Sequence, residues 1–556
     1  GWQYGWQAPT RIDSFQDPIL CTNYRRRTNL TEAPTPPQNR SATLVGSGIF
    51  ISRISGFFRD VVIANAFGLG SLMDAYAFAV RIPNFFRNLL SEGALSASFV
   101  PVFSSFLEQK ETDRARRLAQ GMLGFLLSLS ALVVAIGVAM APWIVEMIGP
   151  GLQEEDIALT TKLVRILFPM SGIMIVGAWC LGVLTSHRRF FLPFAAPVIW
   201  NLSQIVGLLI GTRMGWGPLV VVLAWSTLIG SVLQVGIQLP SVRNLLGTVR
   251  PKFDTNFEPT RRTIRNAGPV AAGQGIFQIS SLTDAAIATL LLDGAIAGLY
   301  FAQRLVLLPM ALFGASVAVA ALPEMSRQGN LDEIQPHVIS GFRRIIYFTV
   351  PSAVVLALFG DLITSIVYQR GQFDSTSVRV VHWILAAYAT GLVATSLLKL
   401  FTGVYHAIQD TRTPVKYASV SVIIGILTGA SFAFWMNTHG YGNRAAAGLA
   451  LGGAIGAWIN LGLLSIGLRS RGLPKFRDKV QGTILRVVMG AAIAGLVTWP
   501  MRKALTRVLG DMFMDRILIL MTVFLVGGGC YLLIAGLPET LKRRFRKSTS
   551  HPSDSI

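Results

Sequence analysis

The sequence predicts an all-α membrane protein with about fourteen transmembrane helices. Of its 556 residues, 52% are hydrophobic and only 14% are charged, whereas soluble domains carry roughly 25% charged residues. Long apolar segments recur from about residue 42 to residue 535, and most reach the ~20 residues that a helix needs to cross a bilayer. The alternation of apolar and polar residues that marks a membrane β-barrel is absent.

The predicted spans follow one another with short connections. The second span contains Pro83, which removes a backbone hydrogen bond, and Gly93, which loosens the helix. Helix breaks at membrane depth are tolerated where they line a cavity, so we expect a break near Pro83. The expected spans are 42–67, 72–107, 115–148, 158–186, 191–212, 217–240, 265–292, 295–324, 338–368, 378–407, 413–436, 445–468, 480–500 and 515–536.

Basic residues gather in every second loop. The positive-inside rule therefore places these loops, and both termini, in the cytoplasm, and the even number of spans agrees with this orientation. The formal charge of +21 does not indicate nucleic-acid binding, because most basic residues flank apolar spans. Three basic residues depart from the rule, because they fall at the side of the membrane opposite the cytoplasm: Arg502, Lys503 and Arg507.

An internal repeat indicates two lobes. Gly182 and Pro193 in LGVLTSHRRFFLP recur at an offset of 221 in TGVYHAIQDTRTP, and Asp60 and Tyr76 recur at an offset of 224 as Asp284 and Tyr300. Six spans in each unit predict a parallel repeat around a central cationic cavity, with alternating access.

The domain boundaries follow from the repeat and from composition. We expect a disordered cytoplasmic tail first, because the start of the chain is polar and Pro-rich. The expected units are a tail at 1–41, an N-terminal lobe at 42–246, a basic cytoplasmic linker at 247–264, a C-terminal lobe at 265–470, a helix pair at 471–540 and a basic cytoplasmic tail at 541–556.

Arginines inside the apolar spans are the strongest functional signal. A guanidinium in hydrocarbon costs from about 3 to above 10 kcal/mol, so such residues usually face a wet interior. Arg53, Arg59 and Asp60 lie in SRISGFFRD, where Arg53 shares a helix face with Asp60 and Arg59 points about 100° away from it. We interpret the two arginines as a cavity wall for an anion. The alternative is a structural ion pair between helices.

Four more cations lie within predicted spans. We expect Arg87 to line the cavity and Arg81 to extend to a membrane interface. Arg304 has no acid at helical spacing, so it either faces the cavity or pairs with Asp284 of the preceding span. Lys399 fits a cavity lining and an interfacial position equally well.

The sequence carries no signature of an enzyme. It has no P-loop, so we expect no nucleotide, and its three cysteines form no disulfide or metal framework. His406 and Asp410 stand four residues apart, and we interpret them as an interfacial cap, with a proton or cation relay as the alternative.

Several motifs together are similar to the MurJ (MviN) family of lipid II flippases, in the multidrug/oligosaccharidyl-lipid/polysaccharide exporter superfamily. They are SRISGFFRD, MDAYAFAVRIPNFFRNLLSEGALSASFVP, AQRL and DTRTPVK, and the resemblance covers about residues 42–540. It implies a lipid-tail groove in the C-terminal helix pair, a monomer in the bacterial inner membrane, and lipid II as the transported substrate. It also implies substrate binding by Arg53, Arg59, Arg87 and Arg304, supported by Asp60, Asp74, Glu92 and Asp284. From its position in an apolar run, we add Lys399 to the supporting residues.

The sequence departs from some family members in its acidic residues. Gln303 and Leu307 stand where some members carry acids, and Gly425 and Gly429 align with a polar pair of a sodium site. We therefore expect no metal site, and coupling to the membrane potential in place of sodium. Two rival functions are a flippase for another lipid-linked oligosaccharide and a cation-coupled exporter of the same superfamily. A third is an interaction module that transports nothing, against which the surplus of buried arginines argues.

Overall fold

The computed structural model describes residues 38–90, 94–254, 256–326, 331–472, 477–510 and 512–536. Throughout this part of the chain the regular structure is helical, without strands. Residues 1–37, which make up most of the expected N-terminal tail, and 537–556, which include the whole expected C-terminal tail, lie outside the described residues, as does Glu92.

The N-terminal half consists of helices interrupted mainly near prolines. Pro142, Pro197 and Pro240 occupy the first turn of α6, α9 and α11, where a missing N–H is tolerated. The short α6 and α11 follow long helices, whereas the short α8 precedes the longer α9. The helices are α2 (Gln38–Phe67), α3 (Ser71–Leu90), α4 (Ala94–Glu108), α5 (Thr112–Ala139), α6 (Ala141–Ile148), α7 (Glu154–Ser186), α8 (Phe191–Ala195), α9 (Pro197–Met214), α10 (Leu219–Gly236) and α11 (Leu239–Leu246).

The C-terminal half contains longer helices and one π-helical turn. That turn, Met310–Ala315, follows Pro309 and joins α13 to α14. The helices are α12 (Glu258–Thr289), α13 (Ala295–Pro309), α14 (Ser316–Ser326), α15 (Leu331–Tyr368), α16 (Ser375–Ala407), α17 (Arg412–Thr438), the 3-10 turn η2 (Gly442–Ala445), α18 (Ala446–Ser470), α19 (Arg477–Leu509) and α20 (Phe513–Ala535).

In the part of the chain that the structure describes, each predicted span corresponds to helix over most of its length. Helix α3 continues through Pro83, so the break expected near that residue is wrong. Within the described residues, eleven helices are long and apolar enough to cross a membrane. The predicted spans that fall short of this criterion correspond to α2, to α3 with α4, and to α12. These are the spans that carry Arg53, Arg59, Arg81, Arg87 and Asp284.

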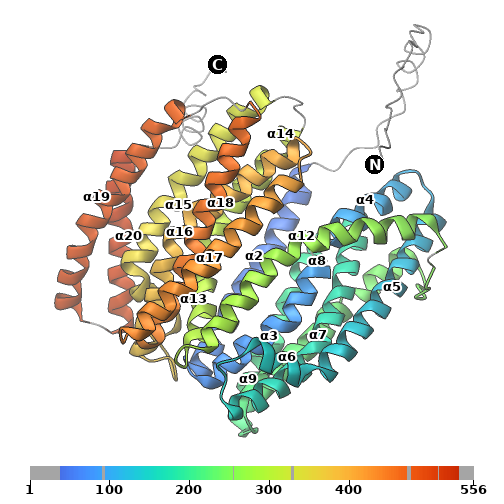
Figure 1. The fold of residues 1–556 in the computed structure, drawn as a ribbon, viewed down its shortest axis with the longest axis horizontal. Coiled ribbons are helices and arrows are strands. Elements are labelled where there is room, and N and C mark those ends of the chain that lie inside the picture. Colours follow the sequence, from blue (N-terminus) through green and yellow to red (C-terminus); the bar gives the residue numbers. More distant parts are fainter. Residues whose placement is uncertain are drawn as a thin grey trace, which may run out of the picture.

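The two halves repeat one packing pattern. In the N-terminal half α7 packs against α3, α5 and α10, and α9 packs against α10; in the C-terminal half α16 packs against α13, α15 and α18, and α17 packs against α18. Figure 1 shows these halves side by side, with α19 and α20 outside the C-terminal half. Such correspondence is what a duplicated six-helix unit would produce.

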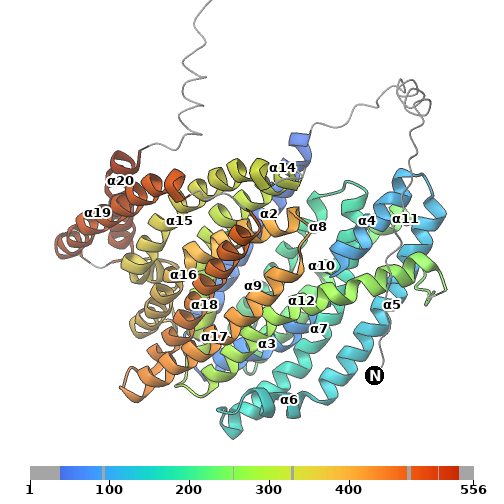
Figure 2. The same ribbon diagram turned by 45° about the horizontal axis from the view of Figure 1, so that its top comes forward.

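Helix α12 departs from the expected division. It packs against α3 and α4 of the N-terminal half as well as against α17, and Figure 2 shows it crossing between the halves. It begins at Glu258, so helix replaces the last part of the predicted linker. The remaining linker is held on α5, because Arg117 Nε donates to Asp254 Oδ2 at 2.7 Å and this bond holds the pKa of Asp254 below its ordinary value.

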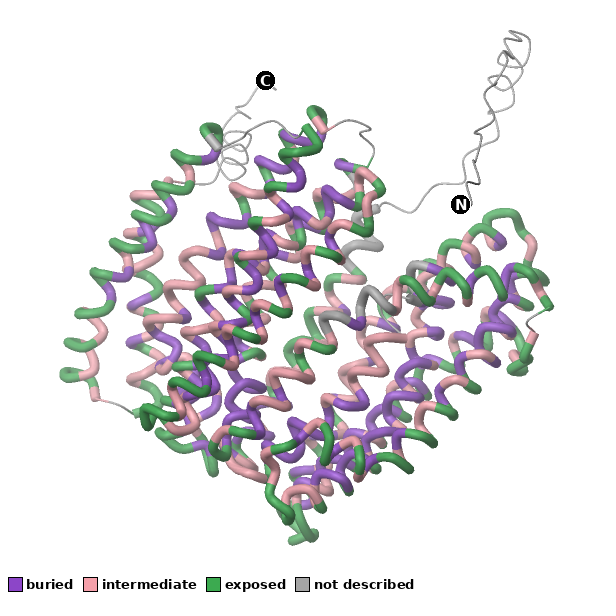
Figure 3. Tube along the Cα trace, viewed as in Figure 1, coloured by how far each residue is buried: buried purple, intermediate pink, exposed green. Residues whose placement is uncertain are grey.

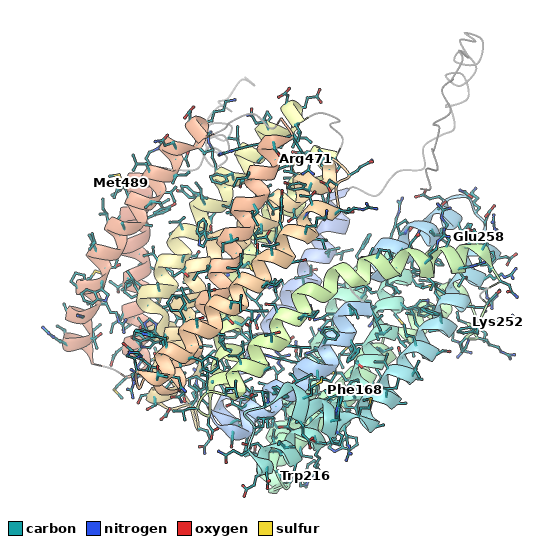
Figure 4. All side chains as sticks on the ribbon, viewed as in Figure 1. Phe168, Trp216, Lys252, Glu258, Arg471 and Met489 are labelled. Carbon is teal, nitrogen blue, oxygen red and sulfur yellow. The ribbon has the colours of Figure 1, made fainter. Side chains whose placement is uncertain are left out.

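Chain connections alternate between two ends of the molecule. Glu258 and Arg471 lie toward one end and Trp216 toward the other (Figure 4). Buried residues form a core along each half, whereas much of the outer surface of the helices is exposed and apolar, as at α10, α17 and α20 (Figure 3). An apolar outer surface is what lipid contact requires.

The halves are joined at the end whose loops are poor in basic residues. Gln372 N donates to Asn65 O at 3.0 Å, and Gly151 N donates to the Thr289 hydroxyl at 3.2 Å. Gly371 adopts φ +54°, and a Cβ there would lie 2.5 Å from the Asn65 carbonyl oxygen. At the opposite end, Figure 1 shows the ribbons of α4 and α14 set apart.

Candidate functional site

An ion pair between Arg59 and Asp60 is the most buried charged group of α2. Their exposed fractions are 5% and 4%. The Arg59 guanidinium donates from Nε and Nη2 to Asp60 Oδ1 at 3.1 and 2.7 Å, and from Nη1 to Asn201 Oδ1 at 2.9 Å. It also lies 5.0 Å from the centroid of the Trp200 ring. The expectation that Arg59 points away from Asp60 is wrong, because its long side chain turns back to the neighbouring carboxylate.

Two residues of α13 complete the surroundings of Asp60. The Tyr300 hydroxyl donates to Asp60 Oδ1 at 3.2 Å, and Arg304 Nε lies 3.7 Å from Asp60 Oδ2. The Arg304 side chain is 40% exposed and covers the Tyr300 ring, 4.8 Å from its centroid. One carboxylate therefore serves two guanidinium groups, one from each half, and one positive charge remains in excess.

Arg53 and Lys399 add charge near this group from opposite halves. Both side chains are exposed, Arg53 on α2 and Lys399 on α16, and their charges interact. Within the described part of the chain, neither forms an ion pair with an acidic side chain. Lys399 of the C-terminal half thus lies within electrostatic range of Arg53 of the N-terminal half.

Arg87 belongs to a polar contact between α3 and α12. Its Nε and Nη2 donate to Asn88 Oδ1 at 3.2 and 3.0 Å, and Asn88 Nδ2 donates to Gln278 Oε1 at 3.1 Å. Asn88 and Gln278 carry no charge and gave no signal in the sequence. Their contact is visible only once α12 is seen to cross the N-terminal half.

The cation that acts electrostatically on Asp284 is not the one that we considered. The charge of Asp284 interacts with that of Arg81, on α3, whose Nη1 also lies 3.5 Å from the Ser281 carbonyl oxygen. Arg81 therefore faces α12, and the expectation of an interfacial Arg81 is wrong. The proposed pairing of Asp284 with Arg304 is also wrong, because Arg304 turns toward Asp60 on α2.

Asp74 joins the halves by capping a helix of the opposite half. Its carboxylate accepts hydrogen bonds from the backbone N–H groups of Gly294 and Ala297, both at 2.6 Å. These groups are among the first of α13, whose own N-cap, Gly294, has no side chain. A carboxylate at a helix N-terminus is favourable for its hydrogen bonds and for the helix dipole. Asp74 is thus placed away from Arg53 and Arg59, at the joined end.

An apolar groove lies between the C-terminal helix pair and the C-terminal half. It has a volume of about 490 Å³ and runs between α13, α15, α19 and α20. Leu308 and Phe313 line it beside the π-helical turn, Phe348 lines it from α15, and Phe524 from α20. The groove has the chemistry of a site for an acyl or polyprenyl chain.

Gly425 and Gly429 pack helix against helix. A Cβ at Gly425 would lie 3.1 Å from the Gly452 carbonyl oxygen, and one at Gly429 would lie 3.3 Å from Leu449 Cα. They offer no side-chain oxygen, and no group of three or more His, Cys, Asp or Glu residues that could hold a metal occurs in the described ranges. The region that aligns with a sodium site is thus a close contact of α17 and α18.

Comparison with known proteins agrees with this arrangement. The family model described as "Lipid II flippase MurJ" matches residues 63–519, which is most of the chain. The chain belongs to the MurJ family. The match includes Arg87, Asp284 and Arg304, although Arg53, Arg59 and Asp60 precede it.

Relatives with MurJ names match over most of their own length. A probable lipid II flippase MurJ of Rhizobium meliloti (strain 1021) is 33% identical over 472 residues, covering 82% of this chain and 86% of the relative. The lipid II flippase MurJ of Burkholderia cenocepacia is 31% identical over 471 residues, covering 83% of this chain and 89% of the relative.

Solved structures show the same fold. Lipid II flippase MurJ in an inward closed conformation matches with a TM-score of 0.72 and 25% identity, covering 88% of this chain and 99% of that protein. An inward-facing multidrug resistance MATE transporter of the MOP superfamily matches with a TM-score of 0.62 and 14% identity, covering 78% of this chain and 98% of that protein. The second likeness concerns the fold alone.

Proposed function

We propose that the protein is a lipid II flippase, which moves the undecaprenyl-diphosphate-linked peptidoglycan precursor from the inner to the outer leaflet of the bacterial cytoplasmic membrane. It is a transporter and not an enzyme. The observation that carries the proposal is the shared carboxylate: Arg59 and Arg304 meet at Asp60, and the excess charge suits an anionic head group.

The arginines have different roles in this proposal. A diphosphate carries about two negative charges, and a guanidinium fork matches phosphate oxygens in pairs. Arg304 and Arg53 are exposed enough to reach a ligand, whereas Arg59 is enclosed by Asp60, Asn201 and Trp200. We therefore assign substrate contact to Arg304, Arg53 and Arg87, with Lys399 beside them, and a positioning role to Arg59. Asp60 keeps the unloaded site from holding its full positive charge.

The apolar groove at α19 and α20 would receive the polyprenyl chain. Its lining offers aliphatic and aromatic side chains along α15, α19 and α20, and the charged head-group site lies on α2 and α13. The head group would thus lie between the two halves, and the tail would lie at the outer side of the C-terminal half.

The orientation that we propose keeps both termini in the cytoplasm. The joined end then faces outward, because its loops carry fewer basic residues than those at the opposite end. Transport would require the contacts of Asp74, Asn65 and Gly151 to open.

The membrane potential is the energy source that we propose. The empty site carries surplus positive charge, and the loaded site is nearer to neutral. A potential that is positive outside would return the empty carrier to the inward-facing state, at about 2.3 kcal/mol per charge per 100 mV. Collapsing the potential should stop flipping, whereas removal of sodium should not. Flipping that persists without a potential but stops without sodium would contradict this proposal.

Complementation tests the function directly. The chain should restore growth to a conditional mutant that lacks its lipid II flippase, and the Arg304→Ala variant should not, at equal membrane abundance. Flipping of fluorescent lipid II in proteoliposomes should resist competition by an undecaprenyl-linked O-antigen unit. Transport of that unit in place of lipid II would favour the rival flippase. Export of cationic drugs would favour the other rival.

A further inference from the structure

A cationic cavity lies between α15, α16 and α19, apart from the proposed substrate site. It has a volume of about 560 Å³, and its lining includes Asp361, His382, Arg502, Lys503 and Arg507. The three cations on α19 are those that depart from the positive-inside rule. A ligand-binding site that uses these cations would explain why they lie on this side of the membrane.

The charges in this cavity do not cancel. Arg502 forms a two-point ion pair with Asp361, with Nη1 to Oδ1 at 2.8 Å and Nη2 to Oδ2 at 2.5 Å. Asp361 is the one acidic residue among the described residues that line the cavity. Lys503 and Arg507 are exposed and form no ion pair with a described acidic residue. The lining therefore keeps two positive charges in excess, counted with a neutral His382.

The positions of these cations favour a ligand between them. Lys503 and Arg507 stand four residues apart on α19, where like charges repel by about 0.2–0.5 kcal/mol. The Lys503 ammonium is held 3.6 Å from the centroid of the Trp499 ring, one turn back on the same helix. Thr506 offers a hydroxyl to the same cavity.

The depth of the cavity matches a plane of lipid phosphates. Three lining residues lie at the same distance from a helix end. Asp361 and Arg502 stand seven residues before the ends of α15 and α19. His382 stands seven residues after the start of α16. At 1.5 Å per residue, each is about 10 Å from its helix end. Helices of 33 residues, such as α16 and α19, are about 50 Å long. They thus extend about 10 Å beyond each side of a ~30 Å hydrocarbon layer if they are centred on it.

We propose that this cavity binds the phosphate group of an anionic membrane lipid in the outer leaflet. Lys503 and Arg507 would contact the phosphate oxygens, Arg502 would be fixed beside them by Asp361, and Trp499 would lie at the membrane interface. The choice of leaflet rests on the proposed orientation, whereas the binding itself does not depend on orientation or on flipping.

Lipid binding to the purified full-length protein tests the proposal. Native mass spectrometry with phosphatidylglycerol should show one high-affinity site that Lys503→Ala and Arg507→Ala each weaken about fivefold, and the double variant about twenty-five-fold, since each basic residue near a lipid surface contributes ~1 kcal/mol. Both side chains are exposed, so the variants should fold. Arg213→Ala is the matched control, because Arg213 is an exposed arginine in the last turn of α9 at the same end of the molecule. This substitution should leave the affinity for phosphatidylglycerol unchanged.

Two further ligands identify the source of the phosphate. Soluble glycerol 3-phosphate should not displace phosphatidylglycerol at equal concentration, and zwitterionic phosphatidylethanolamine should bind more weakly. Tight binding of glycerol 3-phosphate without binding of the lipid would overturn the lipid assignment. Unchanged lipid affinity in the double variant, or an equal loss in Arg213→Ala, would overturn the site. Neither result would bear on the flipping of lipid II.

Discussion

At the scale of residues, burial separates arginines that look alike in the sequence. Arg53 and Arg59 lie in one motif, yet Arg53 is exposed and Arg59 is enclosed by an acid, an amide and an indole ring. Removal of one partner from a buried ion pair leaves an unpaired charge, which costs about 3–5 kcal/mol. Loss of flipping can therefore arise from a lost ligand contact or from a lost structural pair.

Arg53→Ala and Arg59→Ala should separate these causes. We expect Arg53→Ala to abolish flipping and leave thermal stability in detergent unchanged. Arg59→Ala should abolish flipping and also destabilise the protein by about 3–5 kcal/mol, since Asp60 loses its closest partner. The double variant Arg59→Ala/Asp60→Ala should recover much of that stability but no flipping. Equal melting temperatures for the three variants would show that the ion pair is not structural.

At the scale of elements, small residues decide how closely helices approach. A Cβ on Gly452 of α18 would lie 2.2 Å from Gly429 Cα on α17, whereas one on the adjacent Gly453 would meet nothing within 4 Å. The two helices touch backbone to backbone at this point. The sequence shows both glycines as equivalent members of one run.

Gly452→Ala should therefore destabilise the protein by about 1–3 kcal/mol, the usual cost of overpacking. Gly453→Ala is its matched control and should be neutral or slightly stabilising, because alanine favours helix. Thermal unfolding in detergent, followed by tryptophan fluorescence, measures the difference. Equal effects of the two substitutions would contradict the close contact of α17 and α18.

Helix capping links one element to the opposite half. Asp74→Ala removes both acceptors from the start of α13 and should destabilise the joined end by about 0.5–2 kcal/mol. Asp74→Asn retains one acceptor oxygen and should therefore destabilise the joined end less than Asp74→Ala does. A cysteine at Ala288, which is buried beside this contact, should become more accessible to a thiol reagent in Asp74→Asn and most accessible in Asp74→Ala. Unchanged accessibility in Asp74→Ala would show that the cap does not hold the halves together.

At the scale of the molecule, the contacts at the joined end predict a conformational cycle. The backbones of Asn65 and Gln372 are hydrogen-bonded across the two halves, which brings a cysteine pair within disulfide range. Asn65→Cys/Gln372→Cys should stop flipping when oxidised and recover when reduced. Asn65→Cys alone should remain active under both conditions. Full activity of the oxidised, cross-linked protein would exclude the opening of this end during transport.

Orientation in the membrane is testable at the same scale. A cysteine at Gly217, beside Trp216 at the joined end (Figure 4), should react in intact cells with a membrane-impermeant thiol reagent. A cysteine at Gln409, in the loop between α16 and α17, should react only after the membrane is opened. The reverse pattern would invert the proposed topology and would move the cationic cavity at Lys503 to the inner leaflet.

The helical segments, the intramembrane arginines and the family could be predicted from local sequence. Apolar runs of membrane length leave no alternative to helix, because lipid offers no partners for backbone groups, and the motif around Arg53 and Arg59 is local. The partners across the molecule could not be predicted: Asp60 pairs with Arg304, Asp284 interacts electrostatically with Arg81, and Asp74 caps the start of α13. Each of these contacts joins residues more than two hundred positions apart in the sequence. Helical spacing relates residues within one turn or two, so which helices face one another depends on the packing of the whole chain.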